Sequence, residues 1–300
     1  VVGSSGMGTD TLSSFEAYTG SAVADTITVT ASVTASAVLP QASLVLYGGG
    51  GNDSVDASAA SANILYYAHA SYDGGADTVT LGSGNDQVVA GLENSVANDS
   101  YNGGAGRDLI NLGSYAAGAT GTITLSDAEH FTLNGYVAGT DTFTDFESIT
   151  GAQNGVDNFV LNFSTSTLTS GSSNTLTLNG LGGLDVLTLG SGVNVVMGTD
   201  NFTFSAVPIV NMNSTSANSF TLTNTAFNNA AVVNAWSDAN LTSGDKMMMF
   251  QGTSADTLDI DTASWSNTGN TFSSSGITYN IWHSNALVGD LLIQSGVSVI

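Results

Sequence analysis

Apolar and polar residues alternate with a period of two in short stretches along this chain of 300 residues. Thr alternates with Ile, Val or Leu at 26–30, 121–125 and 174–178. Such alternation predicts short β-strands with one buried face, because successive side chains of a strand point to opposite sides. Helical patterning is confined to about 228–239, where we expect one short helix. The chain is therefore predicted to be all-β.

A nine-residue unit of the form Gly-Gly-x-Gly-x-Asp-x-apolar-x repeats within this pattern. Two copies are complete, at 48–56 and 103–111. Partial copies stand at 72–80, 81–89, 180–188 and 189–197. Repetition at this period is typical of a calcium-binding β-roll or β-solenoid, in which each unit forms one loop and one strand, or half a turn.

The residue types of the unit indicate calcium chemistry. Glycine permits the positive φ that curls a loop so that its carbonyl groups point to a common centre. Aspartate adds a hard anionic oxygen, and Ca²⁺ takes about six to eight oxygen ligands. The candidate metal-site residues in the repeats are Gly48, Gly49, Gly51, Asp53, Gly75, Asp77, Gly82, Gly84, Asp86, Gly103, Gly104, Gly106, Asp108, Gly183 and Asp185.

The spacing of the aspartates predicts which loops are neighbours. Loops on the same edge of a solenoid recur every two units, so we expect one ion between the loops of Asp53 and Asp77. A second ion is expected between the loops of Asp86 and Asp108. The unit at 189–197 carries Asn194 in place of Asp and lies on the opposite edge from Asp185, so that pair predicts a weaker site.

A longer repeat relates 8–20 to 139–151, with eight of thirteen positions identical. It predicts three segments: a module at 1–138 containing the repeats of 48–111, a second at 139–240 containing those of 180–197, and a C-terminal β piece at 241–300. The acidic residues within or just after the two copies are either further ligands or ordinary turn residues: Asp10, Glu16, Asp25, Asp141, Glu147 and Asp157.

The charge balance points in the same direction. Lys and Arg number 2 against 25 Asp and Glu, so the net charge is −23 at pH 7 and few carboxylates have a basic partner. Self-repulsion of this size opposes compaction unless cations neutralise it. Binding of nucleic acid is disfavoured, because it needs Lys and Arg. No run of apolar residues is long enough for a transmembrane helix, and the chain has no Cys.

These repeats resemble those of RTX proteins, which Gram-negative bacteria export by type I secretion and which include adhesins, S-layer proteins, toxins and proteases. The resemblance covers 48–111 and, loosely, 180–197. It implies bound Ca²⁺ and a secreted, cell-surface location. The apolar end at 279–300 is similar to the uncleaved C-terminal export signal of type I substrates. Long tandem arrays are missing, and the Ser, Thr and Asn-rich segments between the units are more similar to S-layer proteins and adhesins.

No catalytic pattern is found. The three His residues form no His-Glu-x-x-His motif, which removes the zinc site of the protease branch. No Gly-x-Ser-x-Gly elbow is present. We therefore expect a protein that is not an enzyme.

The favoured hypothesis is a calcium-dependent structural protein that assembles with itself into an S-layer, sheath or filament, with cell-surface polysaccharide as a further partner. Two alternatives remain open. The chain is the C-terminal export region of a long adhesin, or the same region of a secreted enzyme whose catalytic domain lies elsewhere.

Overall fold

The computed structural model describes residues 17–30, 44–68, 75–90, 97–113, 118–136, 139–168, 175–197 and 201–300. The chain divides into two compact units, one comprising 1–123 and 128–153 and the other 124–127 and 154–300. Almost all of the described secondary structure is β, which confirms the predicted class. The division into 1–138, 139–240 and 241–300 concerns sequence duplication and stays a prediction.

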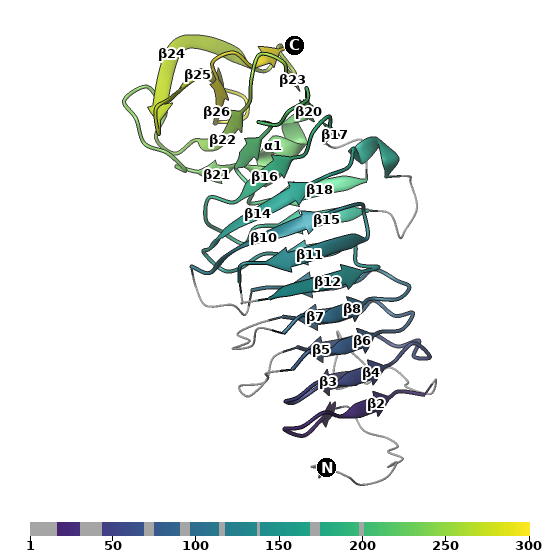
Figure 1. Ribbon diagram of the computed structural model, residues 1–300. Coiled ribbons are helices and arrows are strands. Elements are labelled where there is room, and N and C mark those ends of the chain that lie inside the picture. The colour runs from purple at the N-terminus through teal and green to yellow at the C-terminus, as the bar shows by residue number, and fades with distance from the viewer. Residues whose placement is uncertain are drawn as a thin grey trace. The chain divides into compact units, whose positions relative to one another are not determined.

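The first unit is a β-solenoid in which successive strands join two sheets alternately (Figure 1). One sheet is parallel throughout, because the chain returns to it in the same direction after each turn. Its strands are β1 (Ala17–Thr19), β3 (Leu44–Tyr47), β5 (Ile64–Tyr67), β7 (Gln87–Val89), β9 (Leu109–Asn111) and β13 (Ser148–Thr150).

The second sheet of this unit takes the intervening strands. They are β2 (Thr26–Thr28), β4 (Ser54–Asp56), β6 (Thr78–Thr80), β8 (Ser100–Asn102) and β12 (Thr140–Thr144), all parallel. Beyond them β11 (His130–Asn134) pairs antiparallel with β12 and is followed by β10 (Thr120–Leu125). The predicted strands at 26–30 and 121–125 are therefore present.

Equivalent apolar side chains stack in columns inside the solenoid. Val55, Val79, Tyr101 and Phe143 are paired in register from one coil to the next and are all buried. The rings of Tyr101 and Phe143 stack with centroids 5.0 Å apart. The apolar residue two places after each repeat aspartate faces this interior, as predicted, because the pleat alternates side chains between the two faces.

The second unit begins with similar coils. One parallel series is β14 (Val156–Leu161), β16 (Val186–Leu189), β19 (Ile209–Asn211) and β22 (Lys246–Gln251). A second pairs β15 (Leu176–Asn179) with β18 (Phe202–Ser205). A third is β17 (Asn194–Val196), β20 (Ser219–Leu222), β23 (Thr257–Ile260) and β27 (Ser298–Val299). A 3-10 turn, η1, spans Thr165–Thr167.

The C-terminal part of this unit adds antiparallel strands to the parallel series. Strand β26 (Gly289–Gln294) runs parallel to β22 and antiparallel to β25 (Ile277–Ser284), which pairs with β24 (Ser266–Ser274). Met249, Phe272, Tyr279, Ile281 and Leu292 form a buried cluster between them. The segment that resembles an export signal is thus folded into β25, β26 and β27, and its role in export stays a prediction.

The predicted helix at 228–239 is misplaced. The helix is α1 (Asn224–Ala230), capped by the Thr223 side chain, which accepts a hydrogen bond from Ala226 N. The chain then enters β21 (Val232–Val233), which pairs with β22. The apolar run after Ala230 is β-branched and pairs with a neighbouring strand, which overrides its weak helical pattern. No helix among the described residues is long and apolar enough to cross a membrane.

Candidate functional site

The repeat aspartates lie where each loop enters its strand, and they link successive coils of the first unit. Along one edge, the backbone N–H of each aspartate donates to the carboxylate Oδ1 of the aspartate one coil later. The links run from Asp25 to Asp53 at 2.8 Å, Asp53 to Asp77 at 2.8 Å, Asp77 to Asp99 at 2.7 Å and Asp99 to Asp141 at 3.0 Å. We call this series the first carboxylate ladder.

A second carboxylate ladder follows the strands of the other sheet. Ile64 N donates to Asp86 Oδ1 at 2.6 Å, and Asp86 N donates to Asp108 Oδ1 at 2.6 Å. Asp108 N donates to Glu147 Oε2 at 2.8 Å, so the longer side chain of Glu147 takes the last place. The predicted neighbours, Asp53 with Asp77 and Asp86 with Asp108, are therefore on adjacent coils.

Asparagines beside the ladders form a second, exposed set of hydrogen bonds between coils. In these the N–H of the later coil donates to the earlier coil, which is the reverse of the ladders. Asn52 Oδ1 accepts from Ala76 N, Asn63 Oδ1 from Asn85 N, Asn85 Oδ1 from Arg107 N and Asn98 Oδ1 from Thr140 N. The Asn-Asp pair of the repeat thus joins one coil to both of its neighbours.

The second unit repeats the arrangement with fewer charges. Asp157 N donates to Asp185 Oδ1 at 2.7 Å. On another edge, Val193 N donates to Asn218 Oδ1, and Asn218 N donates to Asp256 Oδ1, both at 2.8 Å.

Val193, and not Asn194, takes the position that aspartate has in the other repeat units, so the alignment of Asn194 with the repeat aspartate is wrong. Asn194 lies one residue further on, in β17, where its exposed side chain accepts from Ser219 Oγ. Val193, Val195 and Met197 are buried on alternate positions. These three side chains set the register, because a shift by one residue would expose all of them.

The glycines of the repeats serve close stacking as well as backbone curvature. Gly49, Gly51, Gly104, Gly106 and Gly183 have positive φ, as predicted. At Gly75 and Gly82 the reason is space: a Cβ would lie 2.0 Å from Gly51 O and 2.2 Å from Ala60 O of the preceding coil. The same holds at Gly84, 2.6 Å from the Ala62 carbonyl.

In each unit, a carboxylate oxygen that has no hydrogen-bond partner and a backbone carbonyl oxygen converge at an equivalent point. A Cβ on Gly103 would lie 2.7 Å from Asp108 Oδ2 and 2.2 Å from the Asp145 carbonyl oxygen. A Cβ on Gly180 would lie 2.1 Å from Asp185 Oδ2 and 2.4 Å from the Ala206 carbonyl oxygen. We call these places the two oxygen cradles.

The backbone of both cradles is unusual. Asp145 and Ala206, which provide the carbonyl groups, have φ of 58° and 51°. Non-glycine residues are uncommon in this left-handed region, and such strain concentrates at ligand sites. Asp108 Oδ2 and Asp185 Oδ2 are buried without a hydrogen-bond partner, as is Asp141 Oδ2. The potential metal ligands in each cradle are a carboxylate oxygen and a carbonyl oxygen, which fits the preference of Ca²⁺ for oxygen ligands.

Burial makes these carboxyl groups hard to ionise. It raises the pKa of Asp108 to about 8, with the charges of Asp86 and Glu147 adding to the effect. Burial also raises the pKa of Asp185 to about 8, with the charge of Asp157 adding. The pKa values of Asp86 and Asp141 are raised by burial to about 6. In each case a hydrogen bond from a neighbouring backbone N–H opposes the shift without cancelling it.

No protein-family model matches this chain. The curated proteins contain no match either. The resemblance to RTX proteins therefore rests on the repeat residues of the sequence alone.

Several ladder residues lacked the full repeat and were not predicted. Asp99 is not preceded by the glycines of the repeat, yet Asn98-Asp99-Ser100-Tyr101 has the same Asn-Asp-x-apolar pattern as 52–55 and 85–88. That four-residue pattern would have found it. Asp256 stands in an Ala-Asp-Thr-apolar pattern at 255–258 that also occurs at 24–27 and 76–79, whereas Asn218 has no such signal. Of the acidic residues left open, Asp25, Asp141 and Glu147 are in the ladders, and Asp157 forms the equivalent link in the second unit. Asp10 and Glu16 lie outside the described residues.

Proposed function

We propose that this chain is a calcium-dependent structural protein that folds and assembles with itself outside the cell. The observation that carries the proposal is the pair of oxygen cradles, in which a buried, unpartnered carboxylate oxygen and a strained backbone carbonyl face the same point. A cation there would balance charges that the protein itself leaves unbalanced, since its sequence has only two basic residues.

Asp108 Oδ2 with the Asp145 carbonyl, and Asp185 Oδ2 with the Ala206 carbonyl, are the groups that would hold Ca²⁺. The ion would supply two positive charges to a row of carboxylates that recurs at the coil spacing of about 4.8 Å. Because the ladders form only in the stacked coils, the free energy of calcium binding would become free energy of folding. A chain of this kind stays loose where calcium is scarce and becomes rigid where it is abundant.

The exposed edge of the second unit supports self-assembly. Strand β24 is the last strand of its sheet, pairs with β25 and is mostly exposed. An edge strand presents unpaired N–H and C=O groups that can pair with another chain. The bulge between Asn267 and Thr271 limits this surface to the regular part of the strand.

The test compares the purified chain in chelator and in millimolar calcium, by circular dichroism, calorimetry and electron microscopy. We expect calcium to increase β-structure, to displace protons from the carboxyl groups whose pKa is raised by burial, and to produce ordered sheets or filaments. Proton release is measured from the dependence of the calorimetric heat on the ionisation enthalpy of the buffer.

Matched variants assign the effect to the cradles. The double variant Asp108→Asn and Asp185→Asn removes two buried charges, and we expect it to lose most of the calcium response. The control, Asp56→Asn and Asp261→Asn, removes two exposed charges and should keep the response. Equal responses in both variants, or a chain that is folded alike with and without calcium, would exclude the proposal.

One further outcome separates the self-assembling role from the alternatives. If calcium folds the chain but leaves monomers, the calcium part stands and self-assembly is excluded. The chain would then be better explained as the export region of an adhesin or of a secreted enzyme. Binding of the monomer to polysaccharide would favour the adhesin.

A further inference from the structure

A second group of potential ligands lies in the C-terminal part of the second unit, away from the repeat loops. Asp245, His283 and Asp290 each offer one ligand atom, and these atoms lie within 4.8 Å of one another. His283 Nδ1 is 2.9 Å from Asp290 Oδ1 and 3.4 Å from Asp245 Oδ2. We call this group the His283 cluster.

The sheet topology brings the three residues together. Strand β26 lies between β25 and β22, with His283 paired to Asp290 across the antiparallel pair. Asp290 is in register with Met247 of β22, and Asp245 immediately precedes that strand. The cluster therefore joins three neighbouring strands, which fixes its geometry.

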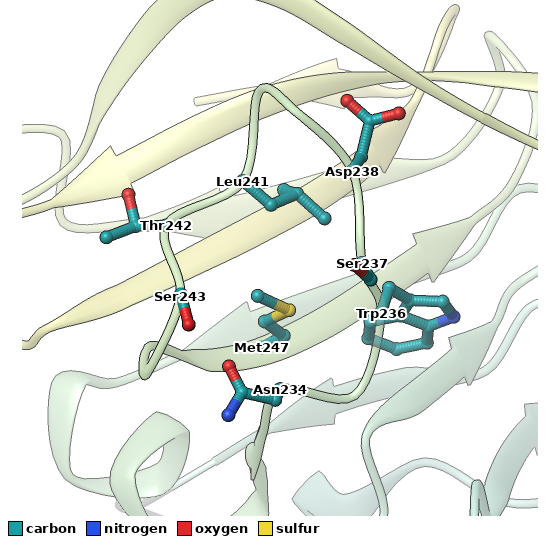
Figure 2. A pocket seen from close by; sticks show the side chains of 8 residues that line it. All are labelled: Asn234, Trp236, Ser237, Asp238, Leu241, Thr242, Ser243 and Met247. Atoms are coloured by element: carbon teal, nitrogen blue, oxygen red, sulfur yellow. The ribbon is translucent and has the colours of Figure 1, made fainter.

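The loop that leads to Asp245 is also tied to the cluster. Thr242 N donates to Asp290 Oδ2 at 3.2 Å, and Asn234 N donates to the Asp245 carbonyl at 3.0 Å. The same loop, with Met247, lines a pocket of about 190 Å³. In Figure 2 the side chains of Leu241 and Met247 point into the space that the loop encloses, whereas the Asp238 carboxylate points outward.

The hydrogen bond on the far side of the imidazole sets its tautomer. His283 Nε2 is 3.2 Å from Asn285 Oδ1, an oxygen that can only accept. A hydrogen bond at this contact places the ring proton on Nε2. In the neutral ring, Nδ1 then has a lone pair that faces two carboxylate oxygens, and either a proton or a metal cation can lie between these acceptors.

A single proton on Nδ1 does not satisfy this arrangement. It can bond well to Asp290 Oδ1, but Asp245 Oδ2 remains buried without a hydrogen-bond partner. Two carboxylates that are 4% and 2% exposed would retain a net negative charge beside an imidazolium. The one lysine does not help, because Lys246 Nζ donates to Asn228 O on α1 at 2.7 Å.

A divalent ion satisfies both requirements. It would neutralise two carboxylates beside a neutral imidazole, and ligand atoms about 2.0–2.2 Å from a tetrahedral ion lie roughly 3.3–3.6 Å apart. The distance of 3.4 Å from Nδ1 to Asp245 Oδ2 falls in that range, whereas the 2.9 Å to Asp290 Oδ1 is shorter and would have to lengthen when the ion binds. Asn285 on Nε2 and Thr242 N on Asp290 are the outer contacts that orient metal ligands in proteins.

We propose that Asp245, His283 and Asp290 form a binding site for a divalent transition-metal ion of the Zn²⁺ type, distinct from the calcium loops. A nitrogen donor favours such ions over Ca²⁺, which takes oxygen ligands. The ion fastens the loop before β22 to the hairpin of β25 and β26. The side chain of His283 is 24% exposed, which leaves a path for the ion to enter.

The experiment is calorimetry of the full chain with Zn²⁺ in buffer containing excess calcium. We expect one zinc ion per chain, not displaced by calcium. His283→Gln and Asp245→Asn should weaken binding by more than about 100-fold, and Asn285→Ala by about 10-fold or more. His130→Gln is the matched control, since His130 is exposed on β11, and should leave the affinity unchanged.

A measurement on the unaltered protein keeps the proposal testable if a variant does not fold. Nitrogen-15 spectra of the histidine rings should show zinc on Nδ1 of His283 with the proton retained on Nε2. Absence of stoichiometric zinc binding in calcium buffer, or unchanged affinity in folded His283→Gln, would overturn the site. Because the ion and the residues differ from those of the cradles, either proposal can fail alone.

Discussion

Individual aspartates of the ladders have two separable roles, a hydrogen-bond acceptor and a charge. The acceptor is sufficient for stacking, because Asn218 takes a ladder position with Oδ1 and donates its Nδ2 to the Met212 carbonyl. The charge destabilises the folded chain, because burial opposes ionisation of Asp108 and Asp185. A stacking role alone therefore does not explain why aspartate occupies these positions.

Replacement of Asp108 should separate the two roles. In calcium-free buffer at about pH 8, Asp108→Asn is expected to raise the free energy of unfolding by roughly 1–3 kcal/mol, because it removes a buried charge and retains the acceptor. Asp108→Ala should instead lower it by about 1–3 kcal/mol, because Asp86 N–H loses its partner. Urea unfolding measures both values. A loss in both variants would contradict the view that the charge is destabilising.

What the sequence could predict at this scale was which loops are adjacent, and not the hydrogen bonds between them. The Gly and Asp spacing identified which loops are adjacent, because it follows the coil length. It could not predict that Oδ1 accepts a hydrogen bond from a neighbouring N–H, while Oδ2 of Asp108 and of Asp185 has no hydrogen-bond partner. The His283 cluster could not be predicted either, since Asp245 is far from His283 in the chain and meets it only through β26.

At some loops the backbones of successive coils are so close that no side chain fits between them. Gly104 and Gly118 have nearly the same φ, 89° and 87°, but differ in surroundings. A Cβ on Gly104 would lie 2.0 Å from Gly82 O, whereas a Cβ on Gly118 would meet nothing within 4 Å. The pair therefore separates stacking from backbone conformation.

We expect Gly118→Ala to lower the free energy of unfolding by about 1 kcal/mol, the usual effect of a side chain at positive φ. Gly104→Ala should lower it by at least about 3 kcal/mol, because the adjacent coil must also move. Thermal or urea unfolding of the calcium-loaded chain gives both values. Equal losses would indicate that the coils can separate without penalty.

The short strands were predictable because each carries its own alternation of buried and exposed residues. Strand β2 and strand β10 match the pattern closely. The helix was misplaced because its position depends on the Thr223 cap and on pairing of β21 with β22, and the second is a contact between distant residues. The predicted register of β17 was wrong for a related reason. Burial of Val193, Val195 and Met197 determines the register, and the imperfect repeat unit at 189–197 does not.

The whole molecule combines a large net negative charge with buried carboxyl groups of raised pKa. Between the ordinary pKa of 3.8 and the folded values of about 6 and about 8, the folded chain binds more protons than the unfolded chain. The free energy of unfolding therefore falls as pH rises through this window.

We expect the calcium-free chain to be most stable toward the acidic side of the window and to lose stability from about pH 4 to about pH 8. With calcium in excess, the ion replaces the protons, so the stabilisation by calcium should grow with pH. Urea midpoints across this range, with and without calcium, measure both trends. A calcium-free chain that gains stability as pH rises would show that these groups are ionised without difficulty.

The aromatic residues give the two units different optical signatures. Trp236, Trp265 and Trp282 are the three tryptophans of the chain, and all lie in the second unit. The stacked rings of the first unit are tyrosine and phenylalanine, including Tyr47 with Tyr67 and Tyr101 with Phe143. Fluorescence excited at wavelengths that only tryptophan absorbs therefore reports on the second unit, while tyrosine emission comes mainly from the first unit, which has eight of the nine tyrosines. Fluorescence of the unlabelled protein can thus tell in which order its two halves become ordered.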